Sequence, residues 1–311
     1  MIHSLFLLLI FPGFIFLSIF GTYAEFVDRK LYARLQNRMG PPWFQPLADF
    51  IKLLAKEDVV PECAVPGIFR IMPIFALAAT TTAFCYVPVW STHSLYPFSG
   101  DVIVVLYLLT IPTITFFLGG WYSTSLFARI GSVRGITQLF AYEVPLFMSI
   151  LAAALLANTW SLTDITLFYS RHPSYTFFNI IGFAVSILAL IGKLEKTPFD
   201  IPEAETEIVA GSFTEYSGRL FAFFRLTIDI EMVVGAALLS AVFLPFGLTL
   251  GPIVGFILFI IKVLFIVGLL ALIRTIVARL RIDQMINFCW KFMAPLALLQ
   301  IIINLILKGV L

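Results

Sequence analysis

Long apolar stretches recur along this chain of 311 residues and are separated by shorter polar segments. A helix that crosses the hydrocarbon core of a bilayer needs about 20 mostly apolar residues. By that criterion the sequence predicts eight membrane-spanning helices, at residues 3–24, 67–90, 101–122, 137–158, 177–195, 227–247, 251–273 and 290–308. We therefore expect an all-α polytopic membrane protein with a single membrane domain over residues 1–311. No internal repeat is visible, so the inverted-repeat design of many transporters has no support.

The composition agrees with this class, because 60% of the residues are hydrophobic and the mean hydropathy is +1.01. A formal net charge of +2 is too small to indicate a nucleic-acid partner. The three Cys and three His are isolated, so we expect neither a disulfide framework nor a metal or other cofactor site in this chain. The apolar N-terminus lacks a cationic start and a small-residue cleavage site, so it is predicted to be the first helix rather than a signal peptide.

The distribution of Lys and Arg predicts the orientation of the bundle. Sixteen of the 20 follow the first, third, fifth and seventh predicted spans, whereas the even-numbered loops hold only Arg171. Cationic loops face the cytoplasm in membrane proteins. We therefore expect a chain of the plasma membrane, in contact with lipid, with its odd-numbered loops cytoplasmic and both termini outside.

The first cytoplasmic loop, residues 25–66, has helical periodicity of its own. Apolar side chains recur at helical spacing with charged residues between them, at Phe44, Leu47, Ile51, Leu54 and Ala55. This pattern predicts an amphipathic helix lying at the membrane interface. It is compatible with a docking edge beside a cavity and equally with a simple membrane-surface anchor.

The segment 192–226 is the most unusual part of the chain. Its first 27 residues carry six of the 18 acids, at Glu195, Asp200, Glu203, Glu205, Glu207 and Glu215. If a helix starts at Pro202, Glu203 and Glu207 share one face and Glu205 lies on the other. Like charges this close are tolerated when some are protonated, paired with cations or hydrated. The segment is therefore either a solvated acidic loop or a proton or ion relay at the mouth of the membrane domain.

Two ionisable residues lie inside predicted spans. Glu143 is about 9–10 Å inside the fourth span, and Pro145 weakens the helix beside it. Lys262 is near the middle of the seventh span, where it needs a carboxylate or water within reach, and Glu143 or the acids of 195–207 are the expected partners. Charged groups at such depth are expensive and mark ion pathways by default, although Glu143 could also be a structural acid. Asp229 and Glu231 are expected nearer the surface.

Four motifs, in order along the chain, carry a resemblance to a known family. They are DRKLYARLQNRMGPPWFQPLADFIKLLAKEDVVP (28–61), VRGITQLFAYEVP (133–145), KTPFDIPEAETEIVAGSFTEYSG (196–218) and RTIVARLRIDQMINFCWKFMAPLAL (274–298). The chain resembles the eight-helix subunit that joins the membrane arm to the peripheral arm in respiratory complex I and in related membrane-bound NiFe hydrogenases.

The resemblance implies roles for particular residues. An ion pathway would run through Glu143, Glu195, Glu203, Glu205, Glu207 and Lys262. Loop residues at the junction with the peripheral arm would be Asp200, Glu215, Arg219 and Arg225. The border of a cavity beneath that arm would be formed by Arg29, Arg34, Arg38, Gln45 and Asp49. Partners would be peripheral subunits with Fe–S clusters and a NiFe or related centre, and antiporter-like membrane subunits.

Departures from the complex I pattern favour the hydrogenase-like branch. The segment GPPWFQP is several residues shorter than in complex I, where this region helps to form the quinone entrance. Lys193 stands where complex I has a Glu, Ile228 takes the place of another family Glu, and the cation Arg225 precedes it. The favoured function is therefore coupling of electron transfer from ferredoxin to protons, giving H₂, with proton or sodium translocation.

Three alternatives remain at this point. The chain could belong to a sulfane sulfur reductase, or it could be the quinone-binding subunit of an NADH, ferredoxin or F420H₂:quinone oxidoreductase. A stand-alone ion transporter is a further class, and the absence of repeats argues against it. In the first two cases, as in the hydrogenase case, this subunit itself would carry no catalytic residue.

Overall fold

The computed structural model describes residues 2–248 and 251–310; the side chains of residues 2–5, 205, 206 and 310 fall outside this description. Over the described residues the chain is helical and contains no strand. Its α-helices are α1 Ile2–Leu9, α2 Phe14–Leu35, α3 Gln45–Leu54, α4 Pro66–Phe84, α5 Asp101–Tyr122, α6 Leu126–Ala157, α7 Leu162–Arg171, α8 Pro173–Phe178, α9 Ile180–Lys193, α10 Glu205–Ile208, α11 Gly218–Phe243, α12 Pro252–Ile276, α13 Ile282–Phe288 and α14 Ala294–Val310. A 3₁₀ turn covers Gly211–Phe213, and a π-helix at Cys289–Met293 joins α13 to α14.

Seven of these helical stretches within the described residues are long and apolar enough to cross a membrane, and α9 is a shorter apolar helix. The predicted all-α membrane fold is therefore confirmed. Several helices begin earlier than the apolar pattern indicates: α6 at Leu126 and α11 at Gly218, against 137 and 227. Polar side chains in these extra turns hid the helices from a search for apolar runs.

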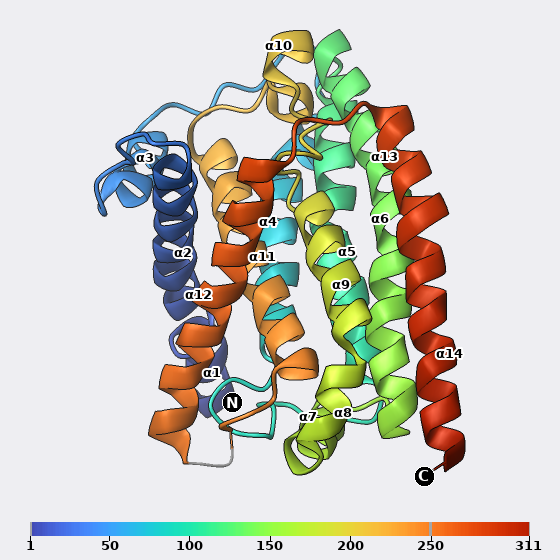
Figure 1. Cartoon of the computed structure of the whole chain (residues 1–311). Coiled ribbons are helices and arrows are strands. Elements are labelled where there is room, and N and C mark those ends of the chain that lie inside the picture. The colour runs from blue at the N-terminus through green and yellow to red at the C-terminus, as the bar shows by residue number, and fades with distance from the viewer. Residues whose placement is uncertain (1, 249–250, 311) are drawn as a thin grey trace.

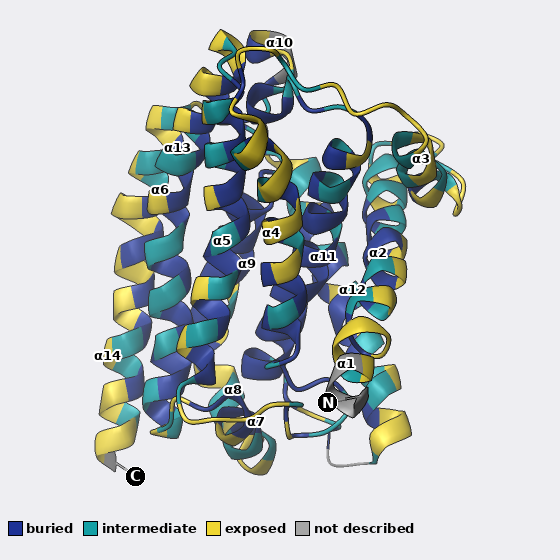
Figure 2. Cartoon of the chain, turned by 180° about the vertical axis from the view of Figure 1, so that it is seen from behind, coloured by how far each residue is buried: buried dark blue, intermediate teal, exposed yellow. Residues whose placement is uncertain are grey.

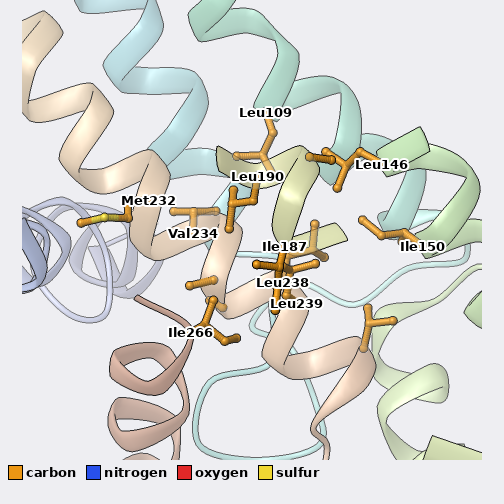
Figure 3. Packing of buried hydrophobic residues seen from close by; sticks show 14 of the residues in the cluster. Leu109, Leu146, Ile150, Ile187, Leu190, Met232, Val234, Leu238, Leu239 and Ile266 are labelled. Carbon is orange, nitrogen blue, oxygen red and sulfur yellow. The ribbon is translucent and has the colours of Figure 1, made fainter. Parts of the chain in front are cut away.

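α11 lies inside the bundle, where other helices surround it (Figures 1 and 2). Within its apolar stretch, 89% of the residues are buried, compared with 28% for the C-terminal helix. Figure 3 shows the packing around it, with side chains of α5, α6, α9 and α12 meeting Val234, Leu238 and Leu239. A Cβ on Gly235 would come within 2.5 Å of Leu190, so the glycine lets α9 and α11 approach closely.

The two ends of the bundle differ in character. The acidic segment with α10 lies at the same end as α3, and both chain termini lie at the opposite end with α7 and α8 (Figure 1). The predicted helix in the first loop exists as α3, and its apolar residues Leu47 and Ile51 are 46% and 56% exposed. Its location at a membrane interface stays a prediction.

Candidate functional site: a charged cavity beneath the acidic segment

A cavity of about 460 Å³ opens at the end of the bundle that carries the acidic segment. Five carboxylates and four cations are among its walls, which comprise Glu25, Leu194, Glu195, Lys196, Thr197, Asp200, Glu203, Ala204, Arg225, Ile228, Asp229, Arg274 and Arg279. These residues come from α2, α11, α12 and the segments that follow α9 and α12. The cavity is therefore a place where charged groups from distant parts of the chain meet.

One wall of the cavity is a network of buried ion pairs. The Lys196 Nζ lies 2.9 Å from Glu25 and 2.7 Å from Asp28. Asp28 is fully buried and also accepts a hydrogen bond from Arg274. Burial lowers the pKa of Lys196, but Asp28 and then Glu25 raise it by more, so its pKa is above the usual value. The network joins α2, α12 and the start of the acidic segment.

The network continues toward α3. Arg29 pairs with Glu25 at 2.8 Å and with Asp49 at 3.4 Å. Asp49 also accepts a hydrogen bond from Gln45 at 2.9 Å, so these residues hold α3 against α2. None of the five residues expected to border a cavity is among the walls of this one: Arg29, Gln45 and Asp49 reach it only through Glu25, and Arg34 and Arg38 are exposed.

The acidic segment is folded differently from the prediction. Pro202 and Glu203 lie in a turn, and α10 contains only four residues from Glu205. Ala204 and Val209 have φ values of +21° and +64°, which the right-handed helix does not allow, so a longer helix cannot form there. The expectation that Glu203 and Glu207 share a helical face is therefore wrong. The side chain of Glu205 lies outside the described residues.

Glu203 and Glu207 consequently meet different cations. Glu203 lies 3.8 Å from Arg225 in the cavity wall. Glu207 pairs with Arg134 at 2.7 Å and with Arg279 at 3.4 Å, and it lines a second cavity of about 360 Å³. Hydrogen bonding by Arg134 and the nearby arginine charges hold the pKa of this exposed carboxyl below its usual value.

Three further residues of the predicted junction connect this segment to its surroundings. Asp200 lies 3.2 Å from Arg279. Arg219 pairs with Asp58 of the first loop at 3.1 Å, and its backbone N–H donates to the same carboxylate at 2.7 Å. Glu215 is half-buried just before α11 and is absent from the described cavity walls. The acidic segment is thus tied both to the first loop and to the segment after α12.

Glu195 lies in the cavity wall and is only 6% exposed. Its φ is +51°, a conformation that costs a residue with a side chain about 1 kcal/mol or more. Its Oε2 atom is buried and accepts no hydrogen bond from the described residues. Burial, with the charges of Glu203 and Glu231, raises the pKa of Glu195 well above its usual value, and Lys193 offsets only part of this.

Below Glu195 lies a buried ion pair between α9 and α11. The Lys193 Nζ is 3.0 Å from Glu231 Oε1, and the two side chains are 2% and 0% exposed. Lys193 also donates a hydrogen bond to the carbonyl of Leu109 in α5. Glu231 was expected near the surface; this is wrong because α11 begins at Gly218, which places Glu231 about 20 Å along the helix.

Glu143 belongs to α6. It is half-buried, and α6 begins early enough to place it about 25 Å from Leu126, rather than 9–10 Å inside a shorter helix. The charge of Lys193 acts on Glu143. Tyr142, fully buried beside it, bonds Thr113 at 3.2 Å and has its ring 5.9 Å from the Lys193 ammonium. The charge of Lys193 thus acts both on Glu143 and on Glu195 of the cavity wall.

Lys262 does not join this group. It donates a hydrogen bond to the carbonyl of Phe246 and lies 4.6 Å from the centre of that ring. Among the described side chains it makes no ion pair with a carboxylate, so the expectation is wrong for Glu143, Glu195, Asp200, Glu203 and Glu207; the side chain of Glu205 lies outside the described residues. The carbonyl of Phe246, three residues after the end of α11, and the face of its ring thus take the place of a carboxylate for this cation.

Five of the nine charged residues in the cavity wall were not among the predicted site residues: Glu25, Lys196, Asp229, Arg274 and Arg279. Glu25 and Asp28, one turn apart on α2, face Lys196 and Arg274, while Asp229 and Arg279 complete the walls. Glu25 and Asp28 could have been found if the first predicted helix had been continued past residue 24, because acids at i and i+3 then lie on one face of it.

The fold and this site define a class: polytopic membrane proteins whose helical bundle encloses a connected set of ionisable side chains. A sequence model of the NADH dehydrogenase family matches residues 7–305. The chain therefore belongs to the NADH dehydrogenase family, and the resemblance to the complex I-type membrane subunit is confirmed.

Individual relatives agree. The chain is 34% identical to the H subunit of NADH-quinone oxidoreductase from Dehalococcoides mccartyi, over 97% of this chain and 86% of that protein. It is 31% identical to the protein of the same name from Carboxydothermus hydrogenoformans, over 94% and 85%. A chain in the structure of the membrane-bound sulfane sulfur reductase, an archaeal respiratory membrane complex, matches with a TM-score of 0.84 and 26% identity, covering 93% of this chain and 96% of that one.

Proposed function

We propose that this chain is the membrane subunit that holds a peripheral redox arm and couples its electron transfer to proton or sodium movement across the plasma membrane. The observation that carries this proposal is a set of titratable groups that influence one another: Glu203 and Glu195 in the cavity wall, and the buried Lys193–Glu231 pair, whose lysine charge acts on both Glu195 and Glu143. Such a set of buried charges is typical of ion pathways in membrane proteins.

The cavity has the properties that the mechanism requires. The buried Glu195 Oε2 and Arg274 Nε atoms in its walls lack hydrogen-bond partners among the described residues, so water is needed to satisfy them. At roughly 30 Å³ per water molecule, about 15 waters fit. Protons can then pass between this water and Glu195. Burial and the neighbouring carboxylates raise the pKa of Glu195 and so favour its protonated form, and a change of charge above the cavity would shift its affinity for the proton.

The test is a Glu143→Gln variant of the complete complex, reconstituted in vesicles. We expect normal assembly and electron transfer, with fewer ions moved per electron, because the neutral amide cannot carry a proton. Glu215→Gln is the matched control, since Glu215 is also half-buried but lies outside the cavity walls. Unchanged ion movement in Glu143→Gln would remove Glu143 from the pathway.

We propose that the electron acceptor is the proton. The peripheral arm would then be of the hydrogenase type, with Fe–S clusters and a NiFe centre, and would use electrons from ferredoxin to reduce protons to H₂. The short GPPWFQP segment and Lys193 support it. The cavity adds support against a quinone site, because an apolar tail would leave nine charged wall residues without water.

Two other acceptors have support of their own. The similarity to a chain of the sulfane sulfur reductase structure supports sulfane sulfur, and the names of the sequence relatives support quinone. Purification of the intact complex separates the three. H₂ evolution from reduced ferredoxin, with antiporter-like and NiFe subunits co-purifying, is the expected result. Sulfide production or quinone reduction in its place would move this chain to the corresponding branch.

A further inference from the structure

Lys193 is the last residue of α9 and is surrounded by groups from three other elements. Its ammonium contacts the Leu109 carbonyl of α5 and Glu231 of α11, and its charge also acts on Glu143 of α6 and on Glu195. Only 2% of its side chain is exposed. A single buried cation therefore pairs with one carboxylate, Glu231, and acts electrostatically on two others.

The pair with Glu231 is poorly secured for a structural ion pair. A buried pair offsets its desolvation only when further hydrogen bonds satisfy the remaining atoms, and otherwise an apolar pair would be as stable. The second Glu231 oxygen, Oε2, is buried and accepts no hydrogen bond from the described residues. By contrast, Lys196 in the cavity wall has two carboxylates within 3 Å.

The alternative partner is close by in the chain. Glu195 lies two residues after Lys193, and its Oε2 is likewise buried and without a hydrogen-bond donor among the described residues. Its left-handed backbone turns the chain directly after α9, so that Glu195 belongs to the cavity wall while Lys193 stays in the bundle. Both carboxylates can thus accept the ammonium, one on each side of the boundary between cavity and bundle.

We propose that Lys193 is a switchable counter-ion, whose ammonium passes between Glu231 inside the bundle and Glu195 in the cavity wall. This inference rests on the proposed function and names the side chain that moves when a proton is transferred. When Glu195 releases a proton to the cavity water, Lys193 pairs with it, and Glu231 takes up a proton from the side of Glu143. The net result is one proton moved toward the cavity, with no change in the total charge of the three groups.

The decisive experiment is the double variant Lys193→Gln/Glu231→Gln in the complete complex, reconstituted in vesicles. Removing both members of the pair together leaves neither Lys193 nor Glu231 as an unpaired buried ion, so the complex should assemble and transfer electrons. Ion movement per electron should nevertheless be largely lost, because the ammonium that passes between the two carboxylates is gone. Coupling at the unmodified level in the assembled double variant would show that the pair is only structural and would overturn the proposal.

A second variant covers failure of the double variant to assemble. Glu195→Gln leaves the Lys193–Glu231 pair intact and removes the other partner, so coupling should fall to the same extent while electron transfer continues. Unchanged coupling in Glu195→Gln would equally refute the switch. Glu143→Gln, measured in parallel, separates the two hypotheses: if it uncouples while both of these variants pump normally, the proposed function stands and the switch fails.

Discussion

Asp28 is the residue whose loss should most weaken the wall of the cavity. It is fully buried on α2 and is shared by Lys196, 2.7 Å away, and Arg274. Removing one partner of a buried ion pair costs about 3–5 kcal/mol, because a charge is left without compensation. Lys196 keeps Glu25 at 2.9 Å, so Asp28→Asn should cost about 3 kcal/mol, near the lower end. That is roughly a 100-fold smaller ratio of folded to unfolded chain.

The pKa of Lys196 decides at which pH the unfolding of Asp28→Asn should be measured. Its pKa is raised above the usual 10.5, since the attraction of Asp28 and Glu25 exceeds the effect of burial, which acts in the opposite direction. A raised lysine pKa contributes stability that is complete below 10.5 and is lost as the pH rises through the folded-state value. At pH 7 the unmodified chain therefore has the whole contribution, and Asp28→Asn should show its largest effect.

The assay is the free energy of unfolding of the purified chain, titrated from a mild into a denaturing detergent. Glu207→Gln is the matched control, because it also removes a carboxylate that is shared by two arginines, but one that is half exposed. Exposed pairs contribute less than about 1 kcal/mol, so this variant should unfold almost like the unmodified chain. Equal destabilisation by the two substitutions would refute the argument from burial.

Two further predictions concern the acidic segment. Gly131→Ala would place a Cβ 2.5 Å from the Gly211 Cα and 2.6 Å from the Ser212 nitrogen, so it should displace the segment and lower both thermal stability and coupling. Gly135→Ala, one turn away, should be tolerated, because the nearest neighbour of its Cβ is a Glu195 oxygen at 3.8 Å. Equal melting temperatures of the two variants would contradict this prediction. Because the pKa of Glu195 is raised above 4.5 in the folded chain, the free energy of unfolding should decline as the pH rises from 4.5 through the folded-state pKa of Glu195. Glu195→Gln should flatten this dependence on pH. The same slope in the variant would exclude Glu195 as its source.

The apolar pattern was sufficient for the fold class and for the position of most helices. The third predicted span, 101–122, has the same bounds as α5. The pattern failed where a helix continues into polar sequence, because a search for apolar runs stops at the first charged turns. α2 extends to Leu35 through Glu25 and Asp28, so Glu25 of the cavity wall and its neighbour Asp28 were not predicted.

The pairing of charges could not be predicted for a different reason. Which cation meets which acid depends on contacts over long sequence distances, such as the 246 residues between Asp28 and Arg274. Lys262 illustrates the consequence: the sequence indicates a buried cation that needs a partner, but it cannot distinguish a carboxylate from the carbonyl of Phe246. Composition thus predicted the existence of a charged site, whereas the fold decides its members.

The position of α3 gives a physical route by which a partner subunit can affect the cavity. α3 has exposed apolar side chains, which a partner or the bilayer would cover. Its Asp49 holds Arg29 at 3.4 Å, Arg29 holds Glu25 at 2.8 Å, and Glu25 shares Lys196 with the buried network. Arg29 thus divides its charge between α3 and the cavity wall. A movement of α3 that breaks the longer contact would leave Arg29 entirely to Glu25, and Glu25 would then attract Lys196 less strongly. The electrostatic potential in the cavity would change although no ion has entered or left it. Coupling between a redox arm and a membrane domain requires a link of this type.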